Sequence, residues 1–384
     1  MSRLLPVEAF GEVAALLSLF LVITVPGAAL TMLMSREAAF RGVSSHSQVR
    51  DLFLYFRSHV FLGAVVFWAL FLLTIPFLGS ELHISYAPFL IFSALVPLTL
   101  ISALQSGTLQ GLQEFFMVSK QNIVATLVKL ATALLLVLAG LSVSGVILAL
   151  VCASLAGFIY GHFATRKLLN IEEGMSQVSM SGIEMGAQFS VIFITTLLVA
   201  LLSNIDVLLA KHYLSPELAG HYGALSTVGK ILIYGVGAFV TVLLPLASAA
   251  YARGEGGERR VLGLSLLGIS LLSFCAWALF TLFPQLVVSI LFGADYLDIT
   301  SQLSSFSIAM GCIALSLALI NYFVAVRNRS FLYLLLIGIV AQIMFIVGNH
   351  DSLGAITQMV VAGSFLLLIL LGLNYFVTHR FRLL

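Results

Sequence analysis

The chain has 384 residues, of which 61% are hydrophobic and only 9% are charged. Soluble globular domains carry about 25% charged residues, so this composition excludes an ordinary soluble enzyme or binding domain. The formal net charge is +2, which says little by itself, and we expect no nucleic-acid partner.

Long apolar segments follow one another along the whole chain. A transmembrane helix needs about 20 mostly apolar residues to cross the hydrocarbon core of a bilayer. The first segment is long, lacks a basic start and is followed by Ser-Arg-Glu, unlike a cleaved signal peptide. These segments predict an all-α, polytopic membrane protein embedded in a lipid bilayer. We predict eleven spans, at residues 10–34, 60–79, 86–110, 119–139, 143–165, 187–210, 219–246, 261–283, 302–326, 330–348 and 354–378.

Lysine and arginine residues fall mostly on one side of these spans. Because cytoplasmic loops are enriched in both residues, we assign the connections after the first, third, fifth, seventh and ninth spans, and the C-terminus, to the cytoplasm. The opposite side has only Arg3 and Lys211. This asymmetry predicts a cytoplasmic C-terminus and an exterior Met1. The cytoplasmic residues are Arg36, Arg41, Arg50, Arg57, Lys120, Arg166, Lys167, Arg253, Arg259, Arg260, Arg327, Arg329, Arg380 and Arg382.

An internal repeat relates the two halves of the sequence. Residues 5–16 (LPVEAFGEVAAL) resemble residues 214–225 (LSPELAGHYGAL), and Gly11 matches Gly220 at a constant offset. Self-similarity of this kind is the sequence signature of a repeated structural unit. The repeat predicts that the chain consists of two related helical bundles.

We place the N-terminal transmembrane bundle at residues 1–167, a cytoplasmic linker at 168–181, and a C-terminal six-helix bundle at 182–384. Only five spans fall in the first bundle, and the span at 187–210 finds no partner among them. Related halves with the same topology need an even number of spans between matching helices. The expectation is therefore a twelve-helix fold whose first helix is missing from this sequence.

Ionisable residues inside the spans are candidates for function, because burying them in lipid costs several kcal/mol unless they face protein or water. Lys129 shares a helix face with Thr126, and Lys230 lies on a longer polar stripe. We predict that these residues line a water-filled cavity and bind an anionic part of the substrate. The alternative is that each lysine pairs with a carbonyl or hydroxyl group at a helix contact. The polar stripe around Lys230 includes Ser226, Thr227 and Tyr234.

Asp206 lies close to the outer end of its predicted span and is a candidate residue for ion coupling. A solvated position at the end of the helix, or pairing with the nearby Lys211, explains the same sequence equally well.

Sequence signatures of catalysis and metal binding are absent. Cys152, Cys275 and Cys312 all lie in apolar spans, and an odd number of such cysteines argues against disulfides and against a metal site. The eight histidines show no ligand spacing, and the motifs HExxH, Walker A and GxSxG do not occur. We therefore expect neither an enzyme nor a cofactor.

Four segments, in order along the chain, carry a resemblance to a known family. Residues 204–206 (Asn-Ile-Asp) and 216–222 (PELAGHY) resemble the connection between its seventh and eighth helices, and residues 5–11 look like the equivalent element of the first half. Residues 109–115 (LQGLQEF) and 291–296 (LFGADY) are similar to two further turns. The chain thus resembles the polysaccharide (O-antigen-type) flippases of the multidrug/oligosaccharidyl-lipid/polysaccharide exporter superfamily.

This resemblance implies a transporter in the bacterial inner membrane that flips a polyprenyl-diphosphate-linked oligosaccharide by alternating access. The cargo would be an O-antigen, capsule or exopolysaccharide unit, and a polysaccharide polymerase and glycosyltransferases would be partners. Lys129 and Lys230 would then attract the diphosphate or an acidic sugar. Three alternatives stay open: a multidrug exporter of the same fold, a membrane enzyme of envelope-glycan assembly, and a non-transporting assembly partner.

Overall fold

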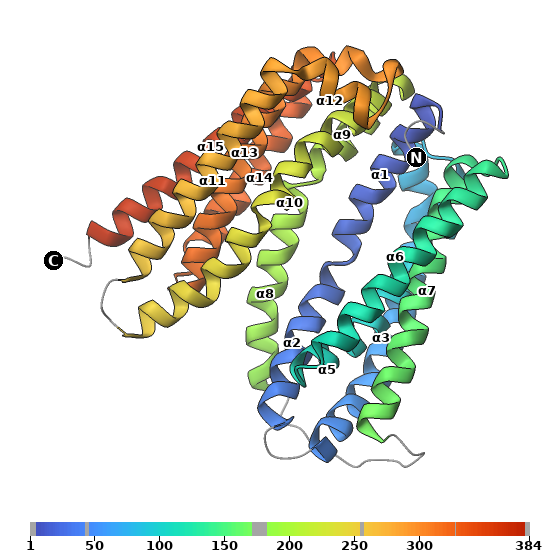
Figure 1. Cartoon of the computed structure of the whole chain (residues 1–384), viewed down its shortest axis with the longest axis vertical. Helices are drawn as coiled ribbons and strands as arrows, with labels where there is room; N and C mark the ends of the chain where they lie inside the picture. Colours follow the sequence, from blue (N-terminus) through green and yellow to red (C-terminus); the bar gives the residue numbers. More distant parts are fainter. Residues whose placement is uncertain (1–4, 43–45, 171–182, 254–256, 327, 381–384) are drawn as a thin grey trace. The chain divides into compact units, whose positions relative to one another are not determined.

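The computed structural model describes residues 5–42, 46–170, 183–253, 257–326 and 328–380, with only the backbone at some helical positions. Every regular element in these ranges is a helix (Figure 1). Within the described ranges, nine helices are long and apolar enough to cross a membrane, and one bent helix pair makes a tenth candidate. The predicted span at 219–246 lies on a further helix, α10 (Pro216–Arg253). The prediction of an all-α, multi-pass membrane protein is confirmed.

Two of the spans are broken next to a proline. The first consists of α1 (Val7–Ile23) and α2 (Val25–Gly42), and the third consists of α4 (Tyr86–Ser93) and α5 (Leu95–Gly111). Pro26 and Pro97 lie in the first turns of α2 and α5. Proline has no N–H and its ring clashes with the carbonyl four residues earlier, so it is tolerated in a first turn and interrupts the helix before it.

The contacts divide the chain into two compact units, and the first comprises mainly residues 16–200. It holds the end of α1, all of α2, α4 and α5, and the helices α3 (His46–Glu81), α6 (Phe115–Leu138) and α7 (Ser142–Leu169), with most of α8 (Ile183–Leu202). Helix α5 is central, because it packs against α2, α3 and α7, while α6 packs along α7.

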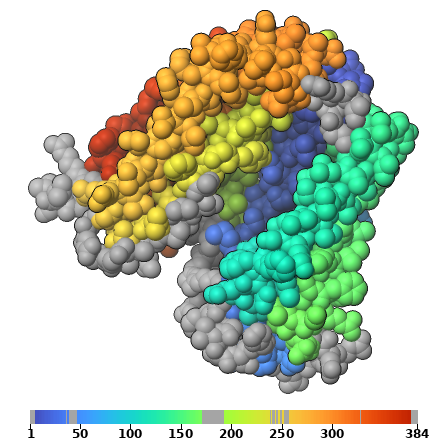
Figure 2. Space-filling model, viewed as in Figure 1, coloured from blue at the N-terminus to red at the C-terminus, as the bar shows by residue number. Residues whose placement is uncertain are grey.

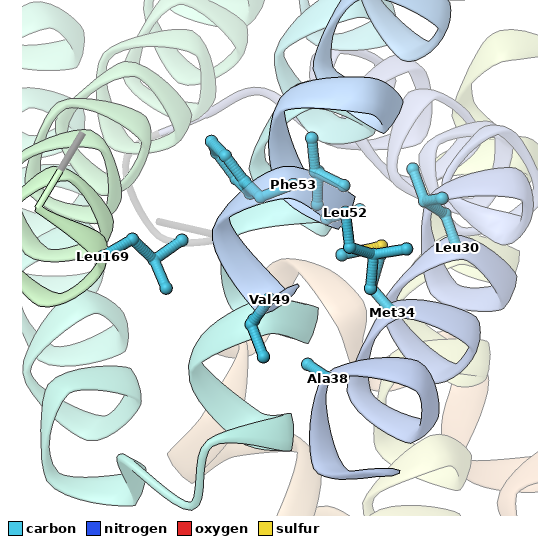
Figure 3. Packing of buried hydrophobic residues seen from close by; sticks show 9 residues of the cluster. Leu30, Met34, Ala38, Val49, Leu52, Phe53 and Leu169 are labelled. Carbon is cyan, nitrogen blue, oxygen red and sulfur yellow. The ribbon is translucent and has the colours of Figure 1, made fainter. Parts of the chain in front are cut away.

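A hydrophobic core joins the helices of this unit near one end (Figure 3). Leu30, Met34 and Ala38 from α2 face Val49, Leu52 and Phe53 from α3. Leu169, the last residue of α7, closes the cluster from the side. Met34, Val49 and Leu52 are fully buried. This end of the unit is therefore held by side-chain packing between segments far apart in the sequence.

The second unit comprises residues 6–15 and 201–384. Helix α13 is central here, because it packs against α10, α11 and α15, while α14 packs along α15. The helices that follow α10 are α11 (Gly257–Leu282), α12 (Pro284–Leu291), the 3-10 helix η1 (Ala294–Ile299), α13 (Thr300–Ala325), α14 (Phe331–Gly348) and α15 (Leu353–Arg380). The short helix α9 (Ile205–Tyr213) precedes α10.

The order of helix pairings is the same in both units. In the first, α5 contacts α2, α3 and α7; in the second, α13 contacts α10, α11 and α15. The pairs α6–α7 and α14–α15 also correspond. This order is what the proposed internal repeat predicts, and the repeat itself stays a prediction. The linker predicted at 168–181 lies largely outside the described residues, since α7 continues to Leu169 and the description resumes at Ile183.

Candidate functional site

A break between two helices creates the site. Residues 193–202 of α8 and the helix α9 meet at an angle of 44°, so the span predicted at 187–210 is bent rather than straight. Asn204 stands at the break, with φ −137° and ψ −15°. Non-helical backbone at membrane depth occurs only where protein buries it or where it lines a wet cavity. Broken helices in transporters accordingly mark positions where polar groups gather.

Asp206 lies in the first turn of α9 and is buried, with only 2% of its surface exposed. The hydroxyl group of Tyr222, on α10, donates a hydrogen bond to Asp206 Oδ2 at 2.9 Å. The other oxygen, Oδ1, is buried and has no hydrogen-bond partner of standard geometry among the described residues, although the backbone N–H groups of Asp206 and Val207 lie near the carboxylate. The partial positive charge of a helix N-terminus favours a carboxylate at this position.

Lys230 provides the positive charge of the site. It lies on α10, two helical turns after Tyr222. Its Nζ donates a hydrogen bond to Asn204 Oδ1 at 2.9 Å. Asp206 and Lys230 also attract each other electrostatically. Asn204, Asp206, Tyr222 and Lys230 thus form one polar cluster, which we call the α9–α10 cluster. Each charged group has one hydrogen bond, and the two opposite charges attract each other across the cluster.

Ser226 lies between Tyr222 and Lys230 on the same face of α10. It is 2% exposed, and its Oγ has no hydrogen-bond partner among the described residues. Residues four apart are neighbours on a helix surface. The buried face of α10 therefore presents hydroxyl, hydroxyl and ammonium groups toward the break between α8 and α9.

Three of the segments that carry the family resemblance pack together in the second unit. Phe10, from residues 5–11, makes edge-to-face contacts with Phe292 and Tyr296, at centroid distances of 5.5 and 5.9 Å. His221 Nε2 donates to the backbone oxygen of Asp295 at 3.1 Å. These aromatic and polar contacts explain why short motifs far apart in the sequence occur together.

Helices α1 and α10 cross closely beside this aromatic cluster. A Cβ atom added to Gly11 would lie 2.8 Å from the backbone nitrogen of Gly220. A Cβ on Gly220 would in turn overlap the carbonyl group of Val7. Only glycine allows backbones to approach this closely. Gly11 and Gly220 are the residues that the proposed repeat pairs with each other.

Lys211, at the end of α9, is buried and interacts electrostatically with Glu12 and Glu8 of α1. The electrostatic partner of Asp206 is instead Lys230. The structure thus favours a paired, buried Asp206 over a solvated residue at a helix end.

The other predicted site residues lie on more exposed surfaces. Tyr234 is 70% exposed, and Thr227 is exposed, with its hydroxyl donating to the carbonyl oxygen of Gly223 at 2.8 Å. Thr126 and Lys129 are exposed on α6 in the first unit. The structure brings together Asp206, Ser226 and Lys230 within the second unit, whereas Thr126 and Lys129 belong to the first unit.

Sequence reasoning did not include Asn204 and Tyr222 among the site residues. Both lie within the motifs at 204–206 and 216–222, so the signal was present in the sequence. Among the described residues, no three His, Cys, Asp or Glu side chains are grouped so that they could hold a metal ion.

The model of the polysaccharide biosynthesis protein family matches residues 1–250, which is most of the chain. The chain belongs to this family. A comparison with curated protein sequences gives no match. The match includes the break between α8 and α9 and most of α10, so the whole α9–α10 cluster lies in the part of the chain that defines this membership.

Solved structures of MOP superfamily transporters share the fold. An inward-facing multidrug resistance MATE family transporter matches with a TM-score of 0.80 and 13% identity, covering 99% of this chain and 91% of that one. The lipid II flippase MurJ, in an inward closed conformation, matches with a TM-score of 0.66 and 14% identity, covering 97% and 85%. A MOP superfamily transporter from Pyrococcus furiosus gives 0.66 and 16%, covering 99% and 88%. At these identities the likeness concerns the fold alone.

Proposed function

We propose that this protein flips a polyprenyl-diphosphate-linked oligosaccharide across the bacterial inner membrane by alternating access. The family of the chain supports a role in polysaccharide biosynthesis, and its fold is shared with a lipid II flippase. The observation that carries the proposal is the α9–α10 cluster, in which an ammonium group on the predicted span 219–246 is held next to a broken helix. Intramembrane charges of this kind mark substrate and ion pathways.

Lys230 would recognise the anionic part of the substrate. Lysine has three N–H donors, and one of them is donated to Asn204. A diphosphate or an acidic sugar would compete with Asp206 for the remaining positive charge. Substrate binding would then weaken the attraction between Asp206 and Lys230. The site would thus have two states: one without substrate, in which Lys230 balances the charge of Asp206, and one with substrate, in which Lys230 balances the charge of the anion.

Asp206 would couple this change to an ion or a proton. When an anion engages Lys230, the carboxylate loses its internal counter-charge and must bind a cation to remain buried. Oδ1, which has no hydrogen-bond partner of standard geometry within the described chain, is the atom that would receive it. We expect Asp206→Asn to remove the dependence of transport on the ion gradient while leaving the hydroxyl contact with Tyr222 possible.

Lys129 would provide the second cation. An exposed lysine in a transmembrane helix must face water, protein or headgroups, because lipid exposure of its charge is costly. Together with Thr126 it forms a polar patch on α6 that suits a hydrated sugar. Thr227 and Tyr234 would likewise offer hydroxyl groups to the sugar from α10.

Flipping of a fluorescent polyprenyl-diphosphate sugar in proteoliposomes tests the proposal. We expect Lys129→Ala and Lys230→Ala to abolish flipping, and Lys129→Arg and Lys230→Arg to keep part of it. The double variant Arg259→Gln/Arg260→Gln is the control, because it removes two exposed charges at the start of α11. Normal flipping by both alanine variants, at equal protein content, would contradict the proposal that Lys129 and Lys230 bind the anionic part of the substrate.

A multidrug exporter is the second candidate function, because a multidrug resistance MATE transporter is among the structures that share the fold. Efflux of an organic cation such as ethidium from proteoliposomes separates the two candidates. We expect no efflux, since an organic cation would be repelled by Lys129 and Lys230. Ethidium efflux without sugar-lipid flipping would favour the exporter.

The proposed setting in the cell is also testable. We propose that the chain acts beside a polysaccharide polymerase and glycosyltransferases, with its C-terminus in the cytoplasm. Fusion of alkaline phosphatase to Arg380 should give no periplasmic activity, while fusion of green fluorescent protein there should fluoresce. The opposite pair of results would reverse the orientation inferred from the basic loops.

A further inference from the structure

A groove runs between α6 and α7 on the surface of the first unit. Its volume is about 700 Å³. Helices α6 and α7 lie side by side at this surface, coloured aqua and green in Figure 2. The lining includes Phe116, Lys120 and Val124 from α6, and Ile159, Phe163 and Lys167 from α7.

Polar contacts behind the groove hold its two walls together. Gln121 Nε2 of α6 donates to the carbonyl oxygen of Gly157 on α7 at 3.0 Å, and Ser106 Oγ of α5 donates to Gln121 Oε1 at 3.2 Å. A Cβ on Gly161 would lie 2.7 Å from Gln121 Nε2. The absence of a side chain at Gly161 leaves room for Gln121 between the helices, as in other small-residue helix contacts. The groove is thus a fixed feature of the packing.

The groove carries its two lysines toward one end, where Phe116 also lies, and is uncharged toward the other. Lys120 and Lys167 are exposed, and Lys120 Nζ lies 4.4 Å from the centroid of the Phe116 ring. Val124 is one helical turn beyond Lys120, and Ala156 lies eleven residues before Lys167, which corresponds to roughly 16 Å along a helix. No acidic side chain is among the described residues that line the groove.

This arrangement complements an anionic lipid. Two lysines can bind a phosphate as point charges, and an apolar wall below them can take an acyl chain. Phe116 and Phe163 are 71% and 64% exposed, so the groove opens to the surface of the unit. Helix α6 is a membrane-span candidate with only 17% of its apolar window buried, so the bilayer itself supplies the occupant.

We propose that the α6–α7 groove binds an anionic glycerophospholipid, with its phosphate between Lys120 and Lys167 and one acyl chain along Val124 and Ile159. On the predicted topology this lipid comes from the cytoplasmic leaflet, whose negative surface attracts basic residues. The groove belongs to the first unit and shares no residue with the α9–α10 cluster, so this inference does not depend on the transported substrate.

Native mass spectrometry of the detergent-purified full chain tests the proposal. Dioleoylphosphatidylglycerol, dioleoylphosphatidylcholine, glycerol phosphate and farnesyl diphosphate would each be titrated into the wild type. We expect retention of phosphatidylglycerol above all others. Lys120→Gln/Lys167→Gln should weaken its binding at least about tenfold, since each basic residue near a lipid surface contributes appreciably to binding. Arg259→Gln/Arg260→Gln, which removes two charges elsewhere, should bind it as the wild type does.

A second variant separates the apolar end from the charged end. Ala156→Trp leaves both lysines in place and fills the groove where the acyl chain would lie, so it should also lose phosphatidylglycerol. Unchanged retention in the lysine double variant, or an equal loss in the arginine control, would refute the site. Tighter binding of farnesyl diphosphate at the same lysines would mean that the occupant is the polyprenyl lipid, and binding of glycerol phosphate alone would mean a simple anion site.

Discussion

Two lysines within predicted spans have opposite surroundings. Lys230 on α10 is half-buried, donates to Asn204 and lies in the field of Asp206. Lys129 on α6 is exposed, and the residues before and after it along the polar face, Thr126 and Thr132, are exposed or half-buried. Hydropathy treats both residues alike. The difference shows that an intramembrane charge is either matched by the protein itself or left for an external partner, and only the fold distinguishes the two.

The largest expected effect follows from removing the matched charge. Lys230→Met removes the positive charge that attracts the buried Asp206 carboxylate and the donor to Asn204. Because Lys230 is half-buried, we expect a loss of up to about 3 kcal/mol, the lower end of the range for breaking a buried pair. Lys129→Met removes an exposed charge and should change stability by less than about 0.5 kcal/mol. Unfolding in detergent, followed by circular dichroism, measures both.

A double variant checks the cause. Asp206→Asn/Lys230→Met removes both charges and should be more stable than either single variant, because each single variant leaves one charge without its partner and the double variant leaves none. If the double variant loses the sum of the two single losses, the residues act independently and the pairing has no energetic weight.

The second effect concerns the other hydrogen bond of Asp206. Tyr222→Phe removes the donor to Oδ2 and should cost about 1.5–3 kcal/mol, as is usual for hydrogen bonds to charged groups. The same substitution in an Asp206→Asn background should cost clearly less, because the acceptor is then neutral. Equal losses in both backgrounds would show that the ring packing, rather than the hydroxyl group, is what matters.

The sequence predicts the spans well because crossing a bilayer requires long apolar helices, and these are visible as long runs of apolar residues. It could not predict the break between α8 and α9, since residues 203–204 are Ser-Asn and contain neither proline nor glycine. Ser and Asn side chains compete for backbone hydrogen bonds, which is only a weak signal. Without the break, the partner of Asp206 cannot be chosen between Lys211 and Lys230.

The third effect compares two glycines of α10. Gly220→Ala would press a methyl group into the carbonyl group of Val7, so we expect a loss of about 1–3 kcal/mol. Gly235→Ala meets nothing within 4 Å and should stabilise the helix by about 0.5–1 kcal/mol. The same unfolding measurement ranks the two. A neutral Gly220→Ala would mean that α1 and α10 separate easily at this crossing.

The sequence did not predict the close packing around α10. The alignment of two short segments paired Gly11 with Gly220 as equivalent positions of a repeat, and the structure places these glycines against each other. Periodicity placed Ser226, Thr227 and Tyr234 on one polar stripe, yet their exposure ranges from 2% at Ser226 to 70% at Tyr234. Polar residues on one side of a helix can include both buried and exposed side chains. The sequence does not say where the boundary between the buried and the exposed ones lies.

The smallest expected effect lies at that boundary. Ser226→Ala removes a buried hydroxyl that has no hydrogen-bond partner among the described residues, so stability should stay constant or rise by up to about 1 kcal/mol. Because the side chain is buried, flipping should change less than twofold, whereas Thr227→Val, on the exposed neighbour, should slow it. A loss of flipping in Ser226→Ala at unchanged stability would mean that the buried face of α10 opens to the substrate during transport. The substrate would then contact Ser226 as well as Lys230 on this face.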